Sequence, residues 1–183
     1  MTLRRGFKAE AERRAVALRA ELGLEPSDRL DINELAKHLG VDIVLADELI
    51  DIGRLEELER IQAFAFSACT FHIDGRHIIV INPLRVVSRQ TSDIAHELAH
   101  ILLGHELSEV LIVADTPFRT CRPDQEEEAT ALGGTLLLPR PLLLHAARKG
   151  YDIAAIARAY GVTEEMARYR YNTTGVNRQA SPR

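Results

Sequence analysis

The segment that most restricts the fold is residues 88–103, where apolar residues recur at helical spacing around a small polar cluster. Ile94, Leu98, Ile101 and Leu102 fall on one face of a helix with 3.6 residues per turn. Alanine and further leucine residues occupy much of the rest of its surface, so we expect this helix to be buried on most sides. Polar groups in such a helix need partners. The segment therefore predicts a core helix that carries a polar site.

The polar cluster reads His96-Glu97-Leu98-Ala99-His100, which is the HExxH pattern. Histidines four residues apart project from the same face of a helix, about 5–6 Å apart at Cβ. Both imidazoles can therefore reach one Zn²⁺ ion at about 2.0–2.1 Å. Glu97 lies about 100° further round the helix, where it can take a proton from a water molecule that attacks a carbonyl. The pattern predicts His96 and His100 as zinc ligands and Glu97 as the catalytic base.

A third ligand is expected from the acidic run Asp124-Gln-Glu-Glu-Glu, which opens the next helix. Acidic residues in a first turn also complement the helix dipole, and this role suffices for one or two of them. The apolar positions within residues 129–136 decide which glutamate faces inward. Glu126 lies about 70° from their centre, Glu128 about 90° and Glu127 about 170°. Glu127 is therefore predicted to face solvent, Glu126 is slightly favoured as the ligand, and geometry alone leaves Glu128 open.

His105 raises the alternative of a third histidine ligand after the same helix. The pattern that uses one is HExxHxxGxxH, which needs glycine at position 103 and histidine at position 106. Leu103 and Glu106 stand there instead, so the register is wrong by one residue. We expect His105 to be a polar residue that ends the helix.

Periodicity and turn residues predict an α+β chain with a small, mainly antiparallel sheet flanked by helices. Helices are expected over residues 8–23, 31–40, 88–103, 124–139, 140–149, 152–160 and 163–171, with a short one within 47–60. Strand regions are expected over 41–45, 61–73 and 77–81, the last two joined by a hairpin at Asp74-Gly75. The nearly apolar run 77–81 is typical of a strand covered on both faces. Residues 104–123 are expected to form a long polar connection.

Two segments, RQTSDIAHELAHILLGH (89–105) and EEEATALGGTLLLP (126–139), resemble the ImmA/IrrE family of zinc metallopeptidases. The resemblance extends more loosely over about residues 5–175. It implies a zincin-like fold and a gluzincin-like site with Glu126 as the third ligand, which leaves one metal position open, as in catalytic zinc sites. Thr130 stands where the family has Asn or Asp that supports a ligand histidine, and Asp93 is assigned the same supporting role.

The resemblance also implies a substrate: a transcriptional repressor of the helix-turn-helix type, cleaved to release stress or mobile-element genes. The group that stabilises the oxyanion is not identified by the sequence. Its candidates, each of which is otherwise an ordinary surface or packing residue, are His145, Tyr151, Tyr169 and Arg170. The alternative from another class is a non-catalytic regulatory protein of the toxin–antitoxin type, which acts by binding.

Residues 153–171 have helix-turn-helix spacing, and Arg168 and Arg170 on the second helix could reach phosphates. Glu164 and Glu165 open that helix, however, and would repel DNA. We therefore expect a helical hairpin packed on the core. The predicted organisation is a peptidase core over residues 1–139, a C-terminal helical subdomain over 140–173 and a disordered tail over 174–183.

Composition argues against several other classes of protein. The formal net charge of −4, the absence of tryptophan and 5% aromatic residues give no basic or stacking surface for nucleic acid. Cys69 and Cys121 are isolated from one another in sequence, which suits a reducing compartment better than a disulfide framework. The first residues lack the apolar core of a secretory signal, and about 18 consecutive apolar residues occur nowhere. We expect a cytoplasmic protein with no membrane partner.

Overall fold

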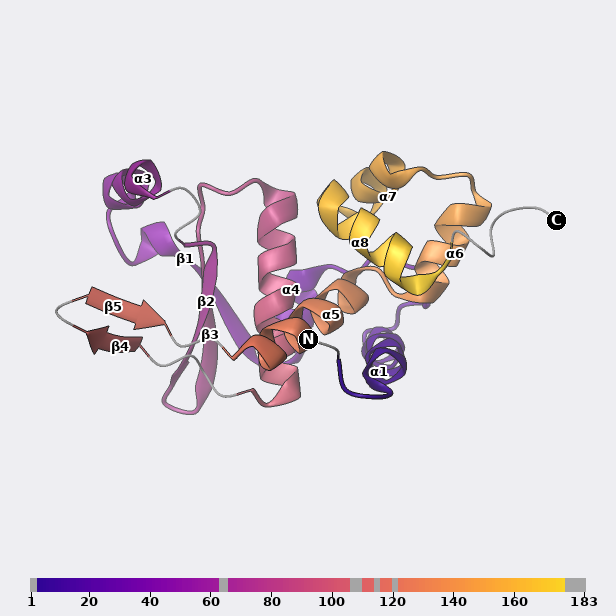
Figure 1. Ribbon diagram of the computed structural model, residues 1–183, viewed down its shortest axis with the longest axis horizontal. Helices are drawn as coiled ribbons and strands as arrows, with labels where there is room; N and C mark the ends of the chain where they lie inside the picture. The colour runs from indigo at the N-terminus through magenta and orange to yellow at the C-terminus, as the bar shows by residue number, and fades with distance from the viewer. Residues whose placement is uncertain (1–2, 63–65, 106–109, 114–115, 120–121, 177–183) are drawn as a thin grey trace.

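The structure is a computed structural model that describes residues 3–62, 66–105, 110–113, 116–119 and 122–176. A three-stranded sheet lies on one side of the molecule, helix α4 packs across it, and α5 crosses in front of α4 (Figure 1). Helix α1 and helices α6 to α8 lie beyond α5, away from the sheet. The helices are α1 (Phe7–Glu21), α2 (Ile32–His38), α3 (Ile52–Ile61), α4 (Val87–Leu103), α5 (Pro123–Leu137), α6 (Arg140–Arg148), α7 (Ile153–Tyr160) and α8 (Glu164–Thr174).

The sheet has the order β1-β3-β2, with β1 at Val41–Leu45, β2 at Ala68–Ile73 and β3 at Arg76–Ile81. Strand β1 runs parallel to β3, whereas β2 and β3 are antiparallel and joined at the predicted hairpin. Asp74 (φ 50°) and Gly75 (φ 78°) both adopt the left-handed conformation that a tight two-residue hairpin turn requires. The α+β class is confirmed. The sheet itself is mixed, because the strand over 41–45 joins it in the parallel sense.

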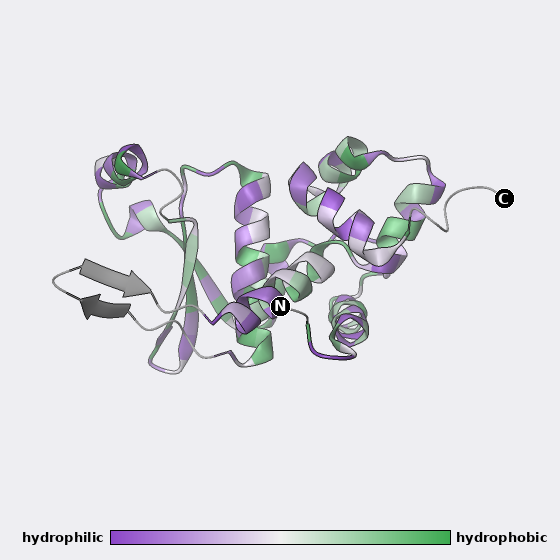
Figure 2. Ribbon diagram, viewed as in Figure 1, coloured by the Kyte–Doolittle hydropathy of each residue, from purple (hydrophilic) through white to green (hydrophobic). Residues whose placement is uncertain are grey.

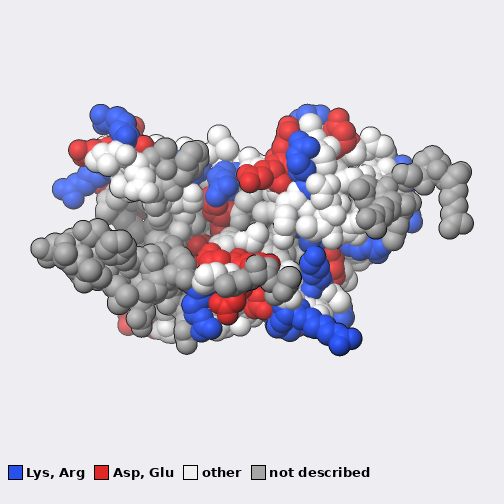
Figure 3. Space-filling model, viewed as in Figure 1, with Lys and Arg blue, Asp and Glu red and all other residues white. Residues whose placement is uncertain are grey.

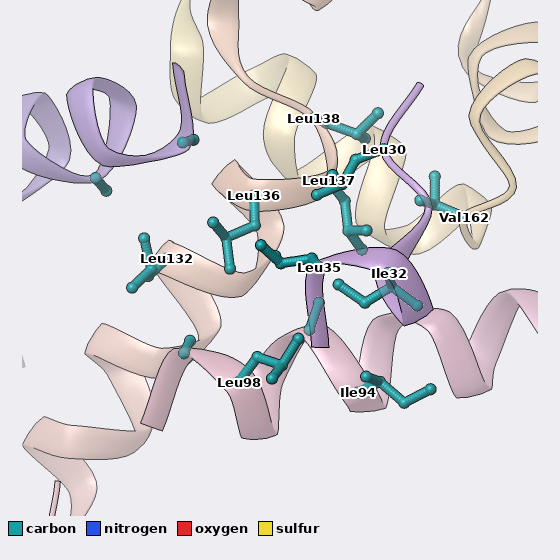
Figure 4. Packing of buried hydrophobic residues seen from close by; sticks show 14 of the residues in the cluster. Leu30, Ile32, Leu35, Ile94, Leu98, Leu132, Leu136, Leu137, Leu138 and Val162 are labelled. Carbon is teal, nitrogen blue, oxygen red and sulfur yellow. The ribbon is translucent and has the colours of Figure 1, made fainter. Parts of the chain in front are cut away.

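The main core lies between α2, α4 and α5. Figure 4 shows Leu35 of α2, Leu98 of α4 and Leu136 of α5 directed into one apolar region, and all three are fully buried. Ile79 and Ile81 of β3 join this core, while Val80 faces a smaller cluster with Ala46 and Leu55 on the other side of the sheet. Strand β3 is therefore covered on both faces, as its apolar sequence predicts.

A buried polar network closes the C-terminal end of α5, where backbone carbonyls have no partner within the helix. Arg19 of α1 donates to the Leu137 carbonyl at 3.2 Å, and Arg170 of α8 donates to the Leu138 carbonyl at 3.1 Å. Arg170 also forms an ion pair with Glu12 of α1 at 2.7 Å. Desolvation lowers the pKa of Arg19 to about 10 and also lowers the pKa of Arg170. The network ties α1 and α8 to the same end of α5.

Most of the expected helices and strands agree with the structure to within a few residues. The strand region expected over 61–73 is shorter, because α3 extends to Ile61 and β2 begins at Ala68. The prediction of a purely polar connection over residues 104–123 is wrong, because β4 (Val110–Val113) and β5 (Thr116–Arg119) form an antiparallel pair there. The run Val110-Leu-Ile-Val is rich in β-branched residues, a local signal that the polarity of the whole segment obscures. Cys121 and residues 177–183 of the expected tail lie outside the described residues. None of the described helices is long and apolar enough to span a membrane.

Candidate metal centre

Helices α4 and α5 approach each other closely next to the HExxH residues. Gly133 of α5 lies against α4. A Cβ atom at that position would stand 2.9 Å from the Ala95 carbonyl oxygen and 3.1 Å from the backbone nitrogen of His96. Any larger residue would therefore push the two helices apart. The first turns of α5 are hydrophilic and its later turns more apolar (Figure 2). The apolar part is buried against α4 and fixes the acidic turn beside the histidines.

Three side chains converge at this place: His96 and His100 of α4 and Glu126 of α5. The two Nε2 atoms of the histidines lie 3.1 Å apart, and Glu126 Oε2 lies 3.1 Å from Nε2 of His96. Glu126 Oε1 lies 3.5 Å from Nε2 of His100. A tetrahedral zinc ion with bonds of about 2.0–2.1 Å separates its ligand atoms by about 3.3–3.4 Å. The three residues thus lie close enough to bind a metal ion, and their nitrogen and oxygen atoms fit one.

Glu126 is charged in this arrangement. Hydrogen bonds with His100 and then His96 hold the pKa of its carboxyl well below its usual range. Acidic side chains gather over the beginning of α5 on the face shown in Figure 3, and the local excess of negative charge favours a bound cation.

Glu97 is buried and lies beside the three converging side chains, on the wall of the same cleft. Its Oε2 atom accepts a hydrogen bond from Thr70 Oγ1 of β2 at 2.6 Å. This bond restrains the orientation of a carboxylate that lines the cleft. Sequence reasoning missed Thr70, because nothing near it in the chain indicates that β2 packs against the HExxH helix.

The cleft has a volume of about 480 Å³ and is bounded by α4, α5 and α8. Of the four oxyanion candidates, Tyr169 lines it. Arg170 is buried in the network with Glu12, His145 is exposed on α6, and Tyr151 packs at the edge of the core. Tyr169 therefore stays a candidate, and Arg170 is excluded because its guanidinium is already bound elsewhere.

The two predicted supporting residues also line the cleft. Asp93 is buried and forms an ion pair with Arg89 at 2.9 Å, while desolvation raises the pKa of its carboxyl. Thr130 is exposed on α5, one turn after Glu126. Both stand near the converging side chains, and their role in supporting a ligand stays a prediction.

His105 does more than end the helix. Its Nδ1 atom lies 3.0 Å from Nδ1 of His100, and its Nε2 atom lies 3.4 Å from Oε2 of Glu128. Glu128, the glutamate left open above, thus faces His105 and not the Nε2 atoms of the two other histidines. Burial lowers the pKa of His105. His105 does not fit the HExxHxxGxxH register as a ligand, and its contact with the far side of the His100 ring has no signal in that motif.

The helix-turn-helix spacing of residues 153–171 corresponds to α7 and α8, joined at Gly161 (φ 69°). Glu165, Met166 and Tyr169 of α8 face the cleft, and Arg170 is buried in the Glu12 network. Arg170 is therefore wrong as a phosphate contact, because its guanidinium points into the protein. Helix α8 serves as a wall of the cleft.

Fold and site together define a class: a small α+β protein with a helix-borne His, His and Glu cluster of the kind that divalent metals bind. The sequence also matches the peptidase M78 family, described as the IrrE N-terminal-like domain, over residues 36–172. The chain belongs to this family, which confirms the resemblance to the ImmA/IrrE proteins, and membership of a metallopeptidase family indicates a metal at the cluster.

Among solved structures, a Mycobacterium tuberculosis transcriptional regulator has a similar fold, with a TM-score of 0.58 and 18% sequence identity. The match covers 90% of this chain and 46% of the regulator, so this chain spans about half the length of that protein. No curated protein matches the chain.

Proposed function

We propose that the chain is a zinc-dependent endopeptidase that acts in the cytoplasm on a regulatory protein, by preference a helix-turn-helix repressor. The observation that carries the proposal is the close triangle formed by His96 Nε2, His100 Nε2 and a Glu126 carboxylate oxygen, with Glu97 beside it in the same cleft. The three ligands would leave one position of a tetrahedral ion open, as catalytic zinc sites do.

In this proposal each side chain has a separate task. A bound zinc ion supplies Lewis acidity toward a peptide carbonyl and lowers the pKa of water. Glu97 takes the proton of the attacking water as oxygen adds to the carbonyl carbon. The same carboxyl then gives the proton to the amide nitrogen as the carbon–nitrogen bond breaks, so that a carboxylic acid and an amine leave. Thr70 holds Glu97 in place for both transfers.

The regulatory substrate is supported by the family resemblance. We propose residues 1–139 as the catalytic core and residues 140–173 as a subdomain packed on it, because Met166 and Tyr169 of α8 complete the cleft opposite α4. A substrate segment would lie between the two. The charged wall residues Arg89, Asp93 and Glu165 favour a substrate segment with polar side chains.

The test uses the purified chain, zinc and a helix-turn-helix repressor encoded by a neighbouring gene. Glu97→Gln keeps an oxygen that can accept from Thr70, so we expect it to retain zinc. Its cleavage rate should fall by about 10²- to 10⁴-fold, the usual contribution of a general acid–base group. His96→Ala should lose both zinc and cleavage. Metal analysis and gel detection of the fragments give the two readouts.

The non-catalytic alternative makes the opposite prediction. A regulatory protein that acts by binding would keep its effect on the target gene in the Glu97→Gln variant. If the purified chain carries no divalent metal and His96→Ala changes neither zinc content nor function, the peptidase proposal is wrong.

A further inference from the structure

A row of side chains leads away from the cluster on the side opposite the metal-facing atoms. It starts at Nδ1 of His100, passes through the ring of His105 and ends at Glu128 of α5. Glu128 Oε1 in turn accepts a hydrogen bond from Arg4 Nε at 3.1 Å. The side chain of His105 is only 7% exposed and that of Glu128 21% exposed, so the row is largely shielded from water.

The backbone explains how a residue five positions after His100 can touch its ring. Gly104 adopts a left-handed conformation (φ 66°) and ends α4. The His105 N–H then donates to the His100 carbonyl at 3.0 Å, and the Gly104 N–H donates to Ile101. This pair of bonds is the Schellman motif, which turns the chain back over the last helical turn. It places His105 against the ring of His100.

The hydrogen-bonding roles along the row follow from its last member. A carboxylate only accepts hydrogen bonds, so the proton of the neutral His105 ring lies on Nε2 and points to Glu128. His105 Nδ1 is then an acceptor, and the proton of the His100 ring must lie on Nδ1 to satisfy it. With its ring proton on Nδ1, His100 presents a lone pair on Nε2, the atom that faces His96 and Glu126. A metal ion bound there would replace the proton through which His100 hydrogen-bonds to Glu126. The row therefore selects the tautomer and the ring orientation that binding of a metal needs.

We infer that His105, held by Glu128, is a positioning residue for His100 that raises the affinity of the cluster for zinc. The inference rests on the proposed metal site. It predicts that substitutions that remove the hydrogen bond between His105 and His100 weaken metal binding. Partners that orient a ligand histidine usually contribute 10- to 100-fold to metal affinity.

The experiment compares two substitutions at position 105. His105→Phe keeps a ring of similar size but offers no acceptor to His100. His105→Asn places its Oδ1 close to the position of Nδ1, where it can accept the same hydrogen bond. We expect His105→Phe to weaken zinc binding by about 10- to 100-fold in competition with a chromophoric chelator. His105→Asn should recover most of this loss.

A second readout reports on the geometry at the metal. In protein loaded with Co²⁺, the visible absorption bands should shift in His105→Phe and return toward those of the unsubstituted protein in His105→Asn. Glu128→Gln tests the other end of the row independently, with an expected loss smaller than that of His105→Phe, since the amide oxygen can still accept. Circular dichroism establishes that each variant is folded. If His105→Phe does not fold, the zinc affinities of His105→Asn and Glu128→Gln test the inference in its place.

The matched control is His38→Phe, which breaks another histidine–glutamate pair. His38 is exposed on α2 and lies 2.9 Å from Glu21, and it does not line the cleft. This variant should bind zinc as the unsubstituted chain does. The inference is overturned if the unsubstituted chain binds zinc and cleaves its substrate while His105→Phe keeps the same zinc affinity and the same Co²⁺ spectrum. Absence of zinc binding in the unsubstituted chain overturns the proposed function and, with it, this inference.

Discussion

The two ends of helix α5 carry polar groups of opposite character. At its beginning, Glu126 and Glu128 face histidines of α4 and the loop that follows it. At its end, the carbonyls of Leu137 and Leu138 accept hydrogen bonds from buried arginines. The arginine end is satisfied within the protein, since Arg170 has Glu12 as its counter-ion. At the glutamate end, three lone-pair donors meet at one point, an arrangement that a bound cation stabilises.

This difference between the two ends predicts that the stability of the fold and the affinity for zinc can be changed separately by substitutions around α5. The arginine end holds α1, α5 and α8 together, and the glutamate end holds the candidate metal site. Substitutions at one end should leave the property of the other end unchanged.

Arg170→Met should produce the largest loss of stability. The substitution removes the guanidinium that pairs with Glu12 and donates to the Leu138 carbonyl, and leaves a largely buried carboxylate without this counter-ion. We expect the free energy of unfolding to fall by about 3 kcal/mol, measured by urea denaturation in the presence of a chelator so that metal binding does not contribute. Zinc affinity of the folded protein should not change.

Arg168→Met provides the control for this substitution, because Arg168 lies on the same helix and is exposed. Its effect should stay within about 0.5 kcal/mol. A loss of zinc affinity in Arg170→Met that matches its loss of stability would contradict the separation of the two ends.

Gly133→Ala should affect both ends, because it acts where α4 and α5 touch. The added methyl group would lie 2.9 Å from the Ala95 carbonyl oxygen, so one helix must move. We expect a net destabilisation of about 1 kcal/mol, since overpacking costs about 1–3 kcal/mol and the gain in helix propensity offsets about 1 kcal/mol of it. Zinc affinity should fall as well, because the shift moves Glu126 away from His96.

Gly134→Ala is the matched control for the Gly133 substitution. Its methyl group would meet the side chains of Met166 and Arg170 and not the backbone of α4. Side chains can adjust more easily than a helix, so zinc affinity should be retained. If the two variants bind zinc equally well, close approach of α4 and α5 does not set the geometry of the site.

The candidate ligands could be predicted because their signals are local. His96 and His100 lie one helical turn apart, so helix geometry relates this part of the sequence to the site. The apolar stripe of α5 favours Glu126 only slightly over Glu128, and the family resemblance supplies the choice between them. The same reasoning predicts β3 as a covered strand and Asp74-Gly75 as a turn. These features depend on residues that lie within a few positions of one another.

The remaining features depend on packing between distant segments. The contact of Thr70 with Glu97 spans 27 residues, and the ion pair of Glu12 with Arg170 spans 158. Neither hydrophobic periodicity nor a sequence motif predicts such contacts. Arg170 therefore entered the prediction as a candidate for the oxyanion or for phosphate, although its environment is a helix terminus. His105 was excluded as a ligand for a sound reason of register, yet the turn at Gly104 brings it to the other face of His100.

Thr70→Val should give the smallest effect and one confined to catalysis. The substitution keeps the shape of the side chain on β2 but removes the hydroxyl that donates to Glu97. The carboxylate then loses its fixed orientation, and we expect kcat to fall about fivefold, which corresponds to about 1 kcal/mol. Zinc affinity should not change, because Glu97 is not one of the three converging side chains. Thr70→Ser retains the hydroxyl and should keep most of the activity. Equal rates in the Val and Ser variants would show that Glu97 is held by its own helix, and that the sheet contributes nothing to the base.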